Sequence, residues 1–351
     1  MKKITLSEIA EKLDISVATV SRVINRKTPV TSDLHQKILE LAREGGYLQN
    51  VWTKNLGNIG LALIGLPDEI SNPLEFELGY NVSRFYGRIT FGLEKAVNEQ
   101  GGNLLIKNFS YTPNVFNEIK DFVKNGGLEG LVVSINGMFE NIHLFNDIAP
   151  TVLINHYQGF VPYVDAVCSN NFGGIKKGFD FLLNHGHTKI GFWKPNYSYY
   201  VHDQNRLYSY FTCLNYYGID YKRIYEDYSD RTDLRPFDRM EIEFRKFLED
   251  KDRPTAILCA NDTFAYIICQ LAKKYDISIP GDLSIIGFDD LEAVSVTSPA
   301  ITSVNSNLLK MGRHAIHLLG KRIENPEREH IELTIEPELV IRDTVSKPNK
   351  N

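Results

Sequence analysis

From Ile59 onward, short apolar runs alternate with longer amphipathic stretches, and this alternation constrains the fold more than any other feature of the sequence. Short apolar runs bounded by turn residues are typical of buried strands, and the stretches between them have helical spacing. Strands that alternate with helices predict parallel sheets joined by right-handed crossovers. The region spans roughly 290 residues, too many for one such sheet, so we expect two similar doubly wound lobes.

The expected elements cover most of this region. The apolar runs predict strands at 59–64, 103–106, 130–134, 151–155, 189–193, 255–259, 283–288 and 301–304. The amphipathic stretches predict helices at 83–100, 113–125, 171–185, 204–217, 237–249, 262–275 and 306–323. Doubly wound sheets bind ligands at the carboxyl ends of their strands. The sequence contains no GxGxxG, GxxxxGK(S/T) or GxSxG motif, which disfavours a dinucleotide, phosphate-loop or hydrolase site.

The first fifty residues contain three short apolar patterns at helical spacing. The first runs over 5–13, and Ser16 is a suitable N-cap for a second helix over 17–24. Pro29 lies in the loop that follows, and a third pattern begins after Thr31 and ends at Gly45. Two short helices joined by a tight turn and supported by a third are typical of a helix-turn-helix unit, whose second helix enters the major groove of DNA.

Charge is distributed unevenly along the chain. The net charge is −5, which by itself argues weakly against a nucleic-acid partner. Residues 1–54, however, hold nine Lys and Arg against six Asp and Glu, and the remaining residues hold 30 against 38. A basic segment in front of an acidic body suits a head that meets phosphate. A chance fluctuation over fifty residues would give the same pattern. Charge alone therefore does not establish a nucleic-acid partner, and the motifs provide the test.

The polar side chains of the second predicted helix are suited to DNA. Thr19 and Ser21 are short hydroxyl donors for phosphate, and Arg22 can bond guanine O6 and N7 bidentately. Val17 and Ala18, at the start of the helix, can contact thymine methyl groups. The alternative is a three-helix protein-interaction module in which Arg22 is only a solvated charge.

Two runs in this segment resemble the DNA-binding head of the lactose/galactose repressor (LacI/GalR) family. They are Ile4-Thr5-Leu6-Ser7-Glu8-Ile9-Ala10 and Ile15-Ser16-Val17-Ala18-Thr19-Val20-Ser21-Arg22-Val23-Ile24-Asn25. Within the second run, Val17-Ala18-Thr19-Val20-Ser21-Arg22 is especially similar to galactose-type repressors. The resemblance implies that Val17, Ala18 and Arg22 read bases. The residues expected to contact DNA in the head are Thr5, Ser16, Val17, Ala18, Thr19, Ser21, Arg22 and Asn25.

A hinge that folds against the minor groove follows the head in this family. Tyr47, Asn50, Thr53 and Leu56 keep the spacing of the family's tyrosine, asparagine, alanine and leucine, with Thr53 in place of alanine. The resemblance implies that Tyr47 and Asn50 contact DNA and that Leu56 is an apolar wedge between base steps. Only Gly57 and Asn58 separate Leu56 from the first strand, which is shorter than in relatives. A plain linker is the alternative.

The body resembles the sugar-responsive core of the same repressors, which shares its fold with periplasmic sugar-binding proteins. The matching motifs include His185-Gly186-His187-Thr188-Lys189-Ile190-Gly191, Asn205-Arg206-Leu207-Tyr208-Ser209, Ala260-Asn261-Asp262, Gly287-Phe288-Asp289-Asp290 and Glu338-Leu339-Val340-Ile341-Arg342-Asp343-Thr344. Family topology implies three chain crossings between the lobes, with lobe N roughly at 58–156 and 297–318 and lobe C roughly at 163–292 and 324–345.

Several polar residues match family positions that contact a sugar. The expected effector-binding residues are Asn155, Arg206, Asn261, Asp289 and Tyr86, where the tyrosine could stack on a sugar face. A guanidinium, a carboxylate and amides can each bond adjacent hydroxyl groups in pairs. The bland alternative is that the Asn and Asp residues at strand ends cap the following helices, and that the tyrosine packs in the core.

The sequence as a whole therefore predicts an all-α helix-turn-helix head and an α/β periplasmic-binding-protein-like core of two doubly wound lobes. The expected boundaries are a head at 1–48, a hinge at 49–57, a core at 58–345 and a tail at 346–351. We expect a cytoplasmic, homodimeric repressor of a sugar-utilisation operon that binds operator DNA and a small sugar, with galactose or a galactoside leading. The alternative is a sugar-binding solute receptor without DNA function.

An enzyme, a metal site and a cofactor are not expected. No nucleophile–base pair and no zinc-type ligand spacing occurs, and no run of eighteen apolar residues could span a membrane. The four scattered cysteines, at 168, 213, 259 and 269, predict buried, reduced thiols.

Overall fold

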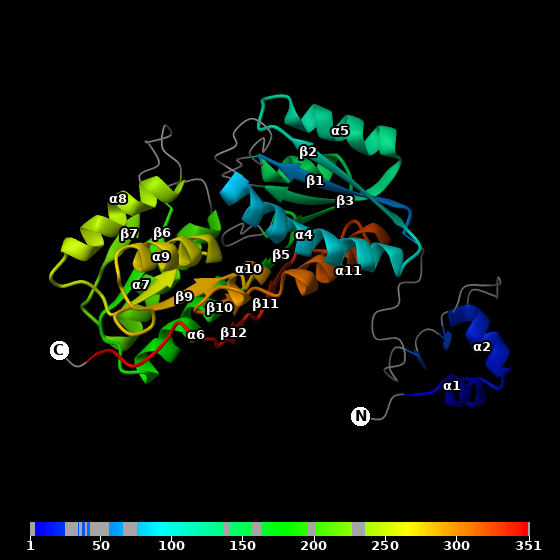
Figure 1. Cartoon of the computed structure of the whole chain (residues 1–351). Coiled ribbons are helices and arrows are strands. Elements are labelled where there is room, and N and C mark those ends of the chain that lie inside the picture. Colours follow the sequence, from blue (N-terminus) through cyan, green and yellow to red (C-terminus); the bar gives the residue numbers. More distant parts are fainter. Residues whose placement is uncertain are drawn as a thin grey trace. The chain divides into compact units, whose positions relative to one another are not determined.

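The chain forms two compact units, Met1–Asn55 and Leu56–Asn351, called here the head and the body (Figure 1). A computed structural model describes residues 4–24, 34, 37–38, 41–42, 56–65, 76–135, 141–155, 163–195, 201–226 and 236–349. Among these residues, no helix has both the length and the apolar character needed to cross a membrane.

The head is a small helical unit with its own core. Its helices α1 (Leu6–Lys12) and α2 (Val17–Ile24) are joined by a short turn, and Leu34, Ile38 and Leu41 are also helical. The buried side chains that form the core are Ile9, Ala10, Val20, Val23, Ile38 and Ala42. These residues come from all three predicted patterns, so the helix-turn-helix prediction is confirmed for the described part of the head.

The body contains two six-stranded sheets, which we call sheet A and sheet B. Sheet A has the order β11-β5-β4-β3-β1-β2, with strands at Asn58–Ile64 (β1), Asn103–Phe109 (β2), Leu128–Ile135 (β3), Thr151–Ile154 (β4), Asp165–Ser169 (β5) and Glu332–Ile335 (β11). Sheet B has the order β12-β10-β9-β8-β6-β7, with strands at Ile190–Lys194 (β6), Ile224–Glu226 (β7), Ala256–Cys259 (β8), Ser284–Phe288 (β9), Thr302–Asn305 (β10) and Glu338–Val340 (β12). All pairings are parallel except β10 with β12.

Helices cover both faces of each sheet, as expected for doubly wound lobes. On sheet A, α4 (Phe76–Asn98) and α11 (Leu308–Glu324) share one core, and α5 (Val115–Gly126) with the 3₁₀ helix Ile142–Asp147 covers the other face. On sheet B, α6 (Asn171–Asn184) and α7 (Val201–Tyr217) share one core. The other face carries α8 (Pro236–Glu249), α9 (Asp262–Lys274) and the short α10 (Glu292–Ser295). The predicted fold class is confirmed.

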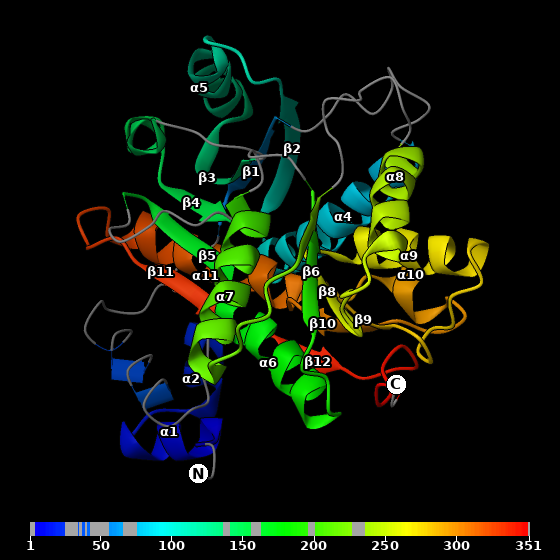
Figure 2. The ribbon, with the colours of Figure 1, turned by 90° about the vertical axis from the view of Figure 1, so that its left-hand side faces the viewer.

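The chain passes between the lobes three times, but not at the predicted positions. Strand β5 pairs with β4 and so belongs to sheet A, although 163–292 was expected in lobe C. Strand β10 pairs with β9 in sheet B, although 297–318 was expected in lobe N. The chain therefore crosses between the lobes after β5, after β10, and between β11 and β12. As a result, β11 is an edge strand of sheet A and β12 is an edge strand of sheet B (Figure 2). Strand pairing, which a linear pattern does not reveal, decides the assignment.

Helices α4 and α11 lie side by side in close backbone contact (Figure 1). A Cβ atom placed on Gly92 would lie 2.4 Å from the carbonyl oxygen of Leu309, and one placed on Gly312 would lie 2.5 Å from that of Ile89. Two glycines, one on each helix, therefore permit this approach. The four cysteines, expected as buried thiols, are free and buried.

Candidate DNA interface and effector site

Helix α2 separates a buried face from an exposed one. Val20 and Val23 are in the head core, whereas Val17 is 44% exposed and Ala18 and Arg22 are also exposed. The three side chains expected to read bases are therefore free of the core. Thr19 and Ser21 are partly exposed beside them. Asn25, Tyr47 and Asn50, the other predicted DNA contacts of the head and hinge, lie outside the described residues.

Thr5 and Ser16 act as helix caps. The Thr5 hydroxyl accepts a hydrogen bond from Glu8 N at 3.2 Å, and Glu8 Oε2 accepts one from Thr5 N at 2.6 Å, which forms a capping box. Ser16 Oγ accepts a hydrogen bond from Thr19 N at 3.0 Å. The N-termini of α1 and α2 are thus well formed, and helix N-termini with short hydroxyl residues are suited to DNA phosphate.

Leu56 occupies a different place from the one predicted. Its side chain is 5% exposed and packs in the core shared by sheet A, α4 and α11. Its backbone N–H donates to Gln100 O at 3.3 Å, and Gly57 N donates to Glu129 Oε2 at 3.2 Å. In this structure Leu56 is therefore the first residue of the body core, and its insertion between base steps of DNA stays a prediction. The expected hinge at 49–57 accordingly overlaps the body at its last two residues.

Three of the predicted effector residues lie at the carboxyl ends of strands in the two sheets. Asn155, Asn261 and Asp289 follow the carboxyl ends of β4, β8 and β9. Arg206 is in the second turn of α7, and Tyr86 is in α4. Their role in binding an effector stays a prediction.

Arg206 and Asp289 form a buried ion pair, with residue exposures of 3% and 5%. Arg206 Nη2 donates to Asp289 Oδ1 at 2.8 Å, and Nη1 donates to Oδ2 at 3.3 Å. The guanidinium also donates to Ala260 O at 2.6 Å and to Asn171 Oδ1 at 3.1 Å, and its Cζ lies 3.8 Å from the centroid of the Phe288 ring. The bidentate geometry and the extra acceptors hold the charge in place without exposing it to water.

Both the carboxylate and the backbone of Asp289 are held by hydrogen bonds. Ser306 Oγ donates to Oδ1 at 2.7 Å, and Asp289 N donates to Val304 O at 2.7 Å. Asp289 has φ = 101° and the next residue, Asp290, has φ = 51°, so the chain turns sharply at the end of β9. This turn directs the Asp289 side chain toward Arg206.

Asn261 has two roles, and one of them is the capping role that the sequence left open. Its Oδ1 accepts hydrogen bonds from Thr263 N at 3.1 Å and Phe264 N at 3.3 Å, which caps α9. Its amide also hydrogen-bonds the side chain of Asp203. Both ends of the Asn261 side chain are therefore engaged by the protein.

Asp203 is a member of this cluster that the sequence prediction missed. It is 6% exposed, and its Oδ1 lies 4.0 Å from Arg206 Nη1. Burial raises the pKa of Asp203 to about 6, although the nearby positive charge of Arg206 lowers it. The sequence could have revealed Asp203, because it lies three residues before Arg206 on the same predicted helix and residues at this spacing share a helix face.

The two lobes meet directly at this edge. Asn155 Nδ2 lies 3.1 Å from His202 Nε2, which joins the end of β4 to the start of α7. Arg88 Nε of α4 donates to Glu292 Oε1 at 2.6 Å and its Nη1 to Asp290 O at 2.9 Å. Tyr86 makes a longer contact, 3.4 Å from Ser134 Oγ to its hydroxyl, and packs against the core.

Lys194 is a second buried cation near this edge. Its Nζ lies 2.9 Å from Glu226 Oε1 and donates to Pro195 O at 3.0 Å, which joins the carboxyl ends of β6 and β7. Lys194 is buried, whereas the Glu226 side chain is 41% exposed.

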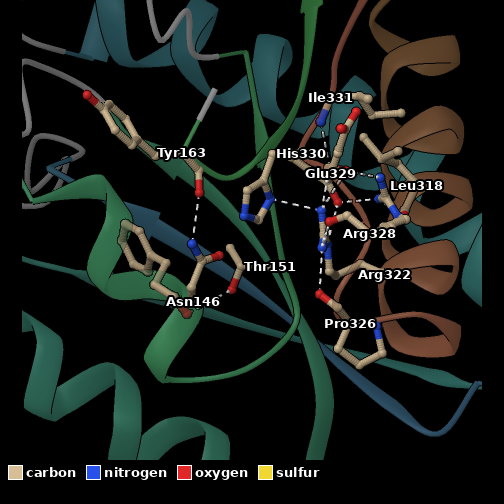
Figure 3. A network of polar contacts seen from close by, with 12 residues as sticks. Asn146, Thr151, Tyr163, Leu318, Arg322, Pro326, Arg328, Glu329, His330 and Ile331 are labelled. Atoms are coloured by element: carbon tan, nitrogen blue, oxygen red, sulfur yellow. Dashed lines mark hydrogen bonds and ion pairs between the residues drawn. The ribbon is translucent and has the colours of Figure 1, made fainter. Parts of the chain in front are cut away.

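A separate polar network lies at the amino end of β5 (Figure 3). Arg322, near the end of α11, donates to the carbonyl oxygens of Pro326, Arg328 and Glu329 and contacts His330. The fully buried Asp165 accepts from Arg322 Nε at 2.9 Å and from Ile331 N at 3.0 Å, and also bonds Arg328. This network anchors the segment between α11 and β11. It lies at the amino ends of the strands of sheet A, whereas Asn155 lies at their carboxyl ends.

Comparison with known proteins agrees with both parts of the chain. Residues 5–50 match the model of bacterial regulatory proteins of the lacI family, and residues 179–345 match that of the periplasmic binding protein-like domain. The transcriptional regulator DegA of Bacillus subtilis (strain 168) is 27% identical over 99% of each chain. The ribose operon repressor of Haemophilus influenzae is 24% identical over 97% of this chain and 98% of the relative.

Solved structures show the same fold. A complex of the transcriptional regulator CelR with cellobiose covers 97% of this chain and 100% of that one, with a TM-score of 0.66 and 22% identity. The lac repressor dimer bound to operator and the anti-inducer ONPF covers 98% and 100%, with a TM-score of 0.65 and 18% identity. In its helix-turn-helix head the chain is thus similar to bacterial regulatory proteins of the lacI family, and in its two-lobed body to the periplasmic binding protein-like domain.

Proposed function

We propose that the chain is a sequence-specific DNA-binding repressor of a sugar-utilisation operon, whose operator affinity is controlled by a small sugar. The observation that carries the proposal is the combination of an exposed Val17, Ala18 and Arg22 face on α2 with a buried Arg206–Asp289 pair at the carboxyl ends of sheet B. The first is suited to base edges, and the second lies at the carboxyl ends of the strands, where doubly wound sheets bind their ligands. A regulator of this kind works in the cytoplasm, where its operator is.

The DNA part of the proposal is tested by a gel shift with the DNA upstream of the protein's own gene. As a homodimer, the protein should bind a near-palindromic site, with one α2 helix in each half-site. Arg22→Ala should cost about 1–3 kcal/mol of binding free energy and relax base preference. Unchanged binding by this variant would contradict the assignment of α2. Light scattering at micromolar concentration should give the mass of a dimer.

The effector part is tested by a thermal-shift screen of sugars, because a bound ligand raises apparent stability by mass action. Galactose and galactosides come first, since the run from Val17 to Arg22 resembles galactose-type heads. Ribose and cellobiose follow, because the similar proteins include a ribose operon repressor and a regulator complexed with cellobiose. A sugar that shifts the melting temperature should also change operator affinity in a gel shift. Weaker operator binding makes it an inducer, and tighter binding makes it a corepressor.

A further inference from the structure

Four consecutive residues at the end of β9 join the predicted effector residues of sheet B to the lobe of sheet A. The first of them, Asp289, pairs with Arg206. The third, Leu291, is buried and packs in the core shared by sheet A, α4 and α11. The fourth, Glu292, accepts a hydrogen bond from Arg88 of α4 at 2.6 Å. One short segment therefore contacts both lobes.

The segment is held firmly on sheet B. The Asp290 carboxylate accepts hydrogen bonds from Arg342 Nη2 at 2.6 Å and from Asn305 Nδ2 at 3.0 Å. Leu291 N donates to Oδ2 of the buried Asp262 at 2.7 Å. Coupling between distant groups is carried by chains of hydrogen bonds and packed side chains of this kind. A displacement at the first residue of the segment is therefore passed to the last one and is not absorbed by the turn.

Arg88 bonds the segment at two points. Besides the bond from Nε to Glu292, its Nη1 donates to Asp290 O at 2.9 Å. The planar guanidinium holds both acceptors in one fixed orientation, which the flexible ammonium group of a lysine does not. The side chains of Arg88 and Glu292 are 24% and 56% exposed, and ion pairs this exposed contribute little to stability. The contact can therefore break and re-form without unfolding either lobe.

Helix α4 leads from this contact to the start of the body. Arg88 lies in the middle of α4, and Gln100, two residues after the helix, accepts a hydrogen bond from Leu56 N at 3.3 Å. Leu56 is the first residue of the body after the head, and its side chain packs in the same core as Leu93 and Val97 of α4. A helix is a rigid element, so a shift of α4 at Arg88 reaches the residue at which the head is attached.

We infer that Arg88 is a positioning residue that transmits the occupancy of the Arg206–Asp289 site to α4 and so to operator affinity. A ligand that hydrogen-bonds Arg206 or Asp289 competes with the bonds that these side chains make to each other and to Ser306, and so moves Asp289. The segment behind Asp289 carries the shift to Glu292, and Arg88 carries it to α4. The inference rests on the proposed function and adds the route of its regulation.

The coupling ratio of the full chain tests the inference. We define it from the operator dissociation constants with and without saturating sugar, the larger divided by the smaller, measured by gel shift with galactose, ribose and cellobiose as probes. Allosteric coupling typically amounts to about 5–150-fold. Arg88→Met, which removes the guanidinium and keeps an unbranched side chain, should lower the ratio about fivefold or more, or to one where the ratio is smaller. Calorimetry should find that the DNA-free variant still binds the same sugar, because Arg88 acts through the segment and not on the sugar.

Arg313→Met is the matched control. Arg313 Nη2 of α11 donates to Glu99 Oε1 at 2.6 Å, and both side chains are about half exposed. Glu99 directly follows α4, so both partners belong to the lobe of sheet A, and the variant removes the same charge as Arg88→Met. The coupling ratio of Arg313→Met should equal that of the unmodified protein.

Two more variants separate transmission from a general loss of structure. Arg88→Lys keeps the charge without the planar guanidinium and should have an intermediate ratio. Glu292→Ala should lower the ratio, and adding it to Arg88→Met should lower it no further, because both changes break one contact. Thermal melts of these variants should stay close to that of the unmodified protein, since the ion pair is exposed.

The failures are distinguishable. If a sugar changes the operator affinity of the unmodified protein and Arg88→Met keeps the full ratio, the inference is overturned and the proposed function stands. An equal loss of the ratio in Arg313→Met, or a loss of sugar binding in Arg88→Met, also overturns it, because the effect then comes from net charge or from the site itself. If none of the three sugars changes operator binding by the unmodified protein, the effector part of the proposed function fails and the inference fails with it, whereas the DNA part stands or falls with its own gel shift.

Discussion

Replacing Asp203 by asparagine should stabilise the protein at neutral pH and leave it unchanged in acid. The pKa of Asp203 is raised to about 6 by burial, against about 3.9 in an unfolded chain. The folded state therefore binds more protons than the unfolded state between these values, and stability falls as the pH rises through this window. This difference in pKa corresponds to a loss of about 3 kcal/mol in the free energy of unfolding. The loss is fully present above about pH 7 and absent below about pH 4. Asparagine has no charge to bury and avoids this cost.

Urea unfolding of the full chain from pH 4 to pH 8, followed by circular dichroism, measures the effect. The midpoint of Asp203→Asn should exceed that of the unmodified protein at pH 7.5, and the two should converge near pH 4. Asp220→Asn, with the same loss of charge at an exposed position, should follow the unmodified protein throughout. A difference between Asp203→Asn and the unmodified protein that does not change with pH would refute the argument, because it would mean that Asp203 does not change its protonation between pH 4 and pH 7.

Three further predictions concern packing and the ion pair. Gly92→Ala should destabilise the body by several kcal/mol, because the new Cβ would lie 2.4 Å from the carbonyl oxygen of Leu309. Gly87→Ala on the same helix, where a Cβ has no atom within 4 Å, should stabilise the body by about 0.5–1 kcal/mol. Thermal melts of the two variants give the comparison. Leu56→Ala should cost about 2–5 kcal/mol of body stability in urea unfolding, and a variant that loses operator bending but no stability would support the wedge prediction instead. Arg206→Ala should abolish the response to the sugar and, by leaving Asp289 buried without its partner, should lower stability by about 3–5 kcal/mol; calorimetry that finds undiminished sugar binding would remove Arg206 from the site.

The sequence was sufficient to predict the long, strongly patterned elements and the exposed face of α2. It missed β5, β7, β11 and β12, which have three to five residues each. Strand β5 begins with Asp165, a charged residue that interrupts an apolar run, although here it is fully buried by Arg322 and Arg328. Periodicity cannot detect a strand whose burial depends on partners more than 150 residues away.

The candidate site was predictable only in part, because some of its residues depend on packing between distant segments of the chain. Arg206 and Asp289 were predicted because they match sugar-contacting positions of the family that the sequence resembles, and the structure pairs them with each other. The role of Leu56 depended on how many residues separate it from β1, because a shortened connection allows the side chain to pack into the body. The role of Asp203 could not be predicted, because it depends on the burial that raises its pKa, and burial comes from packing between segments distant in the sequence.

The alternation of the chain between the lobes affects how the protein is synthesised. Strand β11 completes sheet A beside β5, and β12 completes sheet B beside β10, within residues 332–340. Neither lobe has its last strand until this segment has left the ribosome. The nascent body therefore carries an open sheet edge at β5 through about half of translation, and a second one at β10 once residue 305 has been made. A premature stop before Glu332 would leave both lobes unfinished, and such a fragment would expose the same two edges permanently to aggregation.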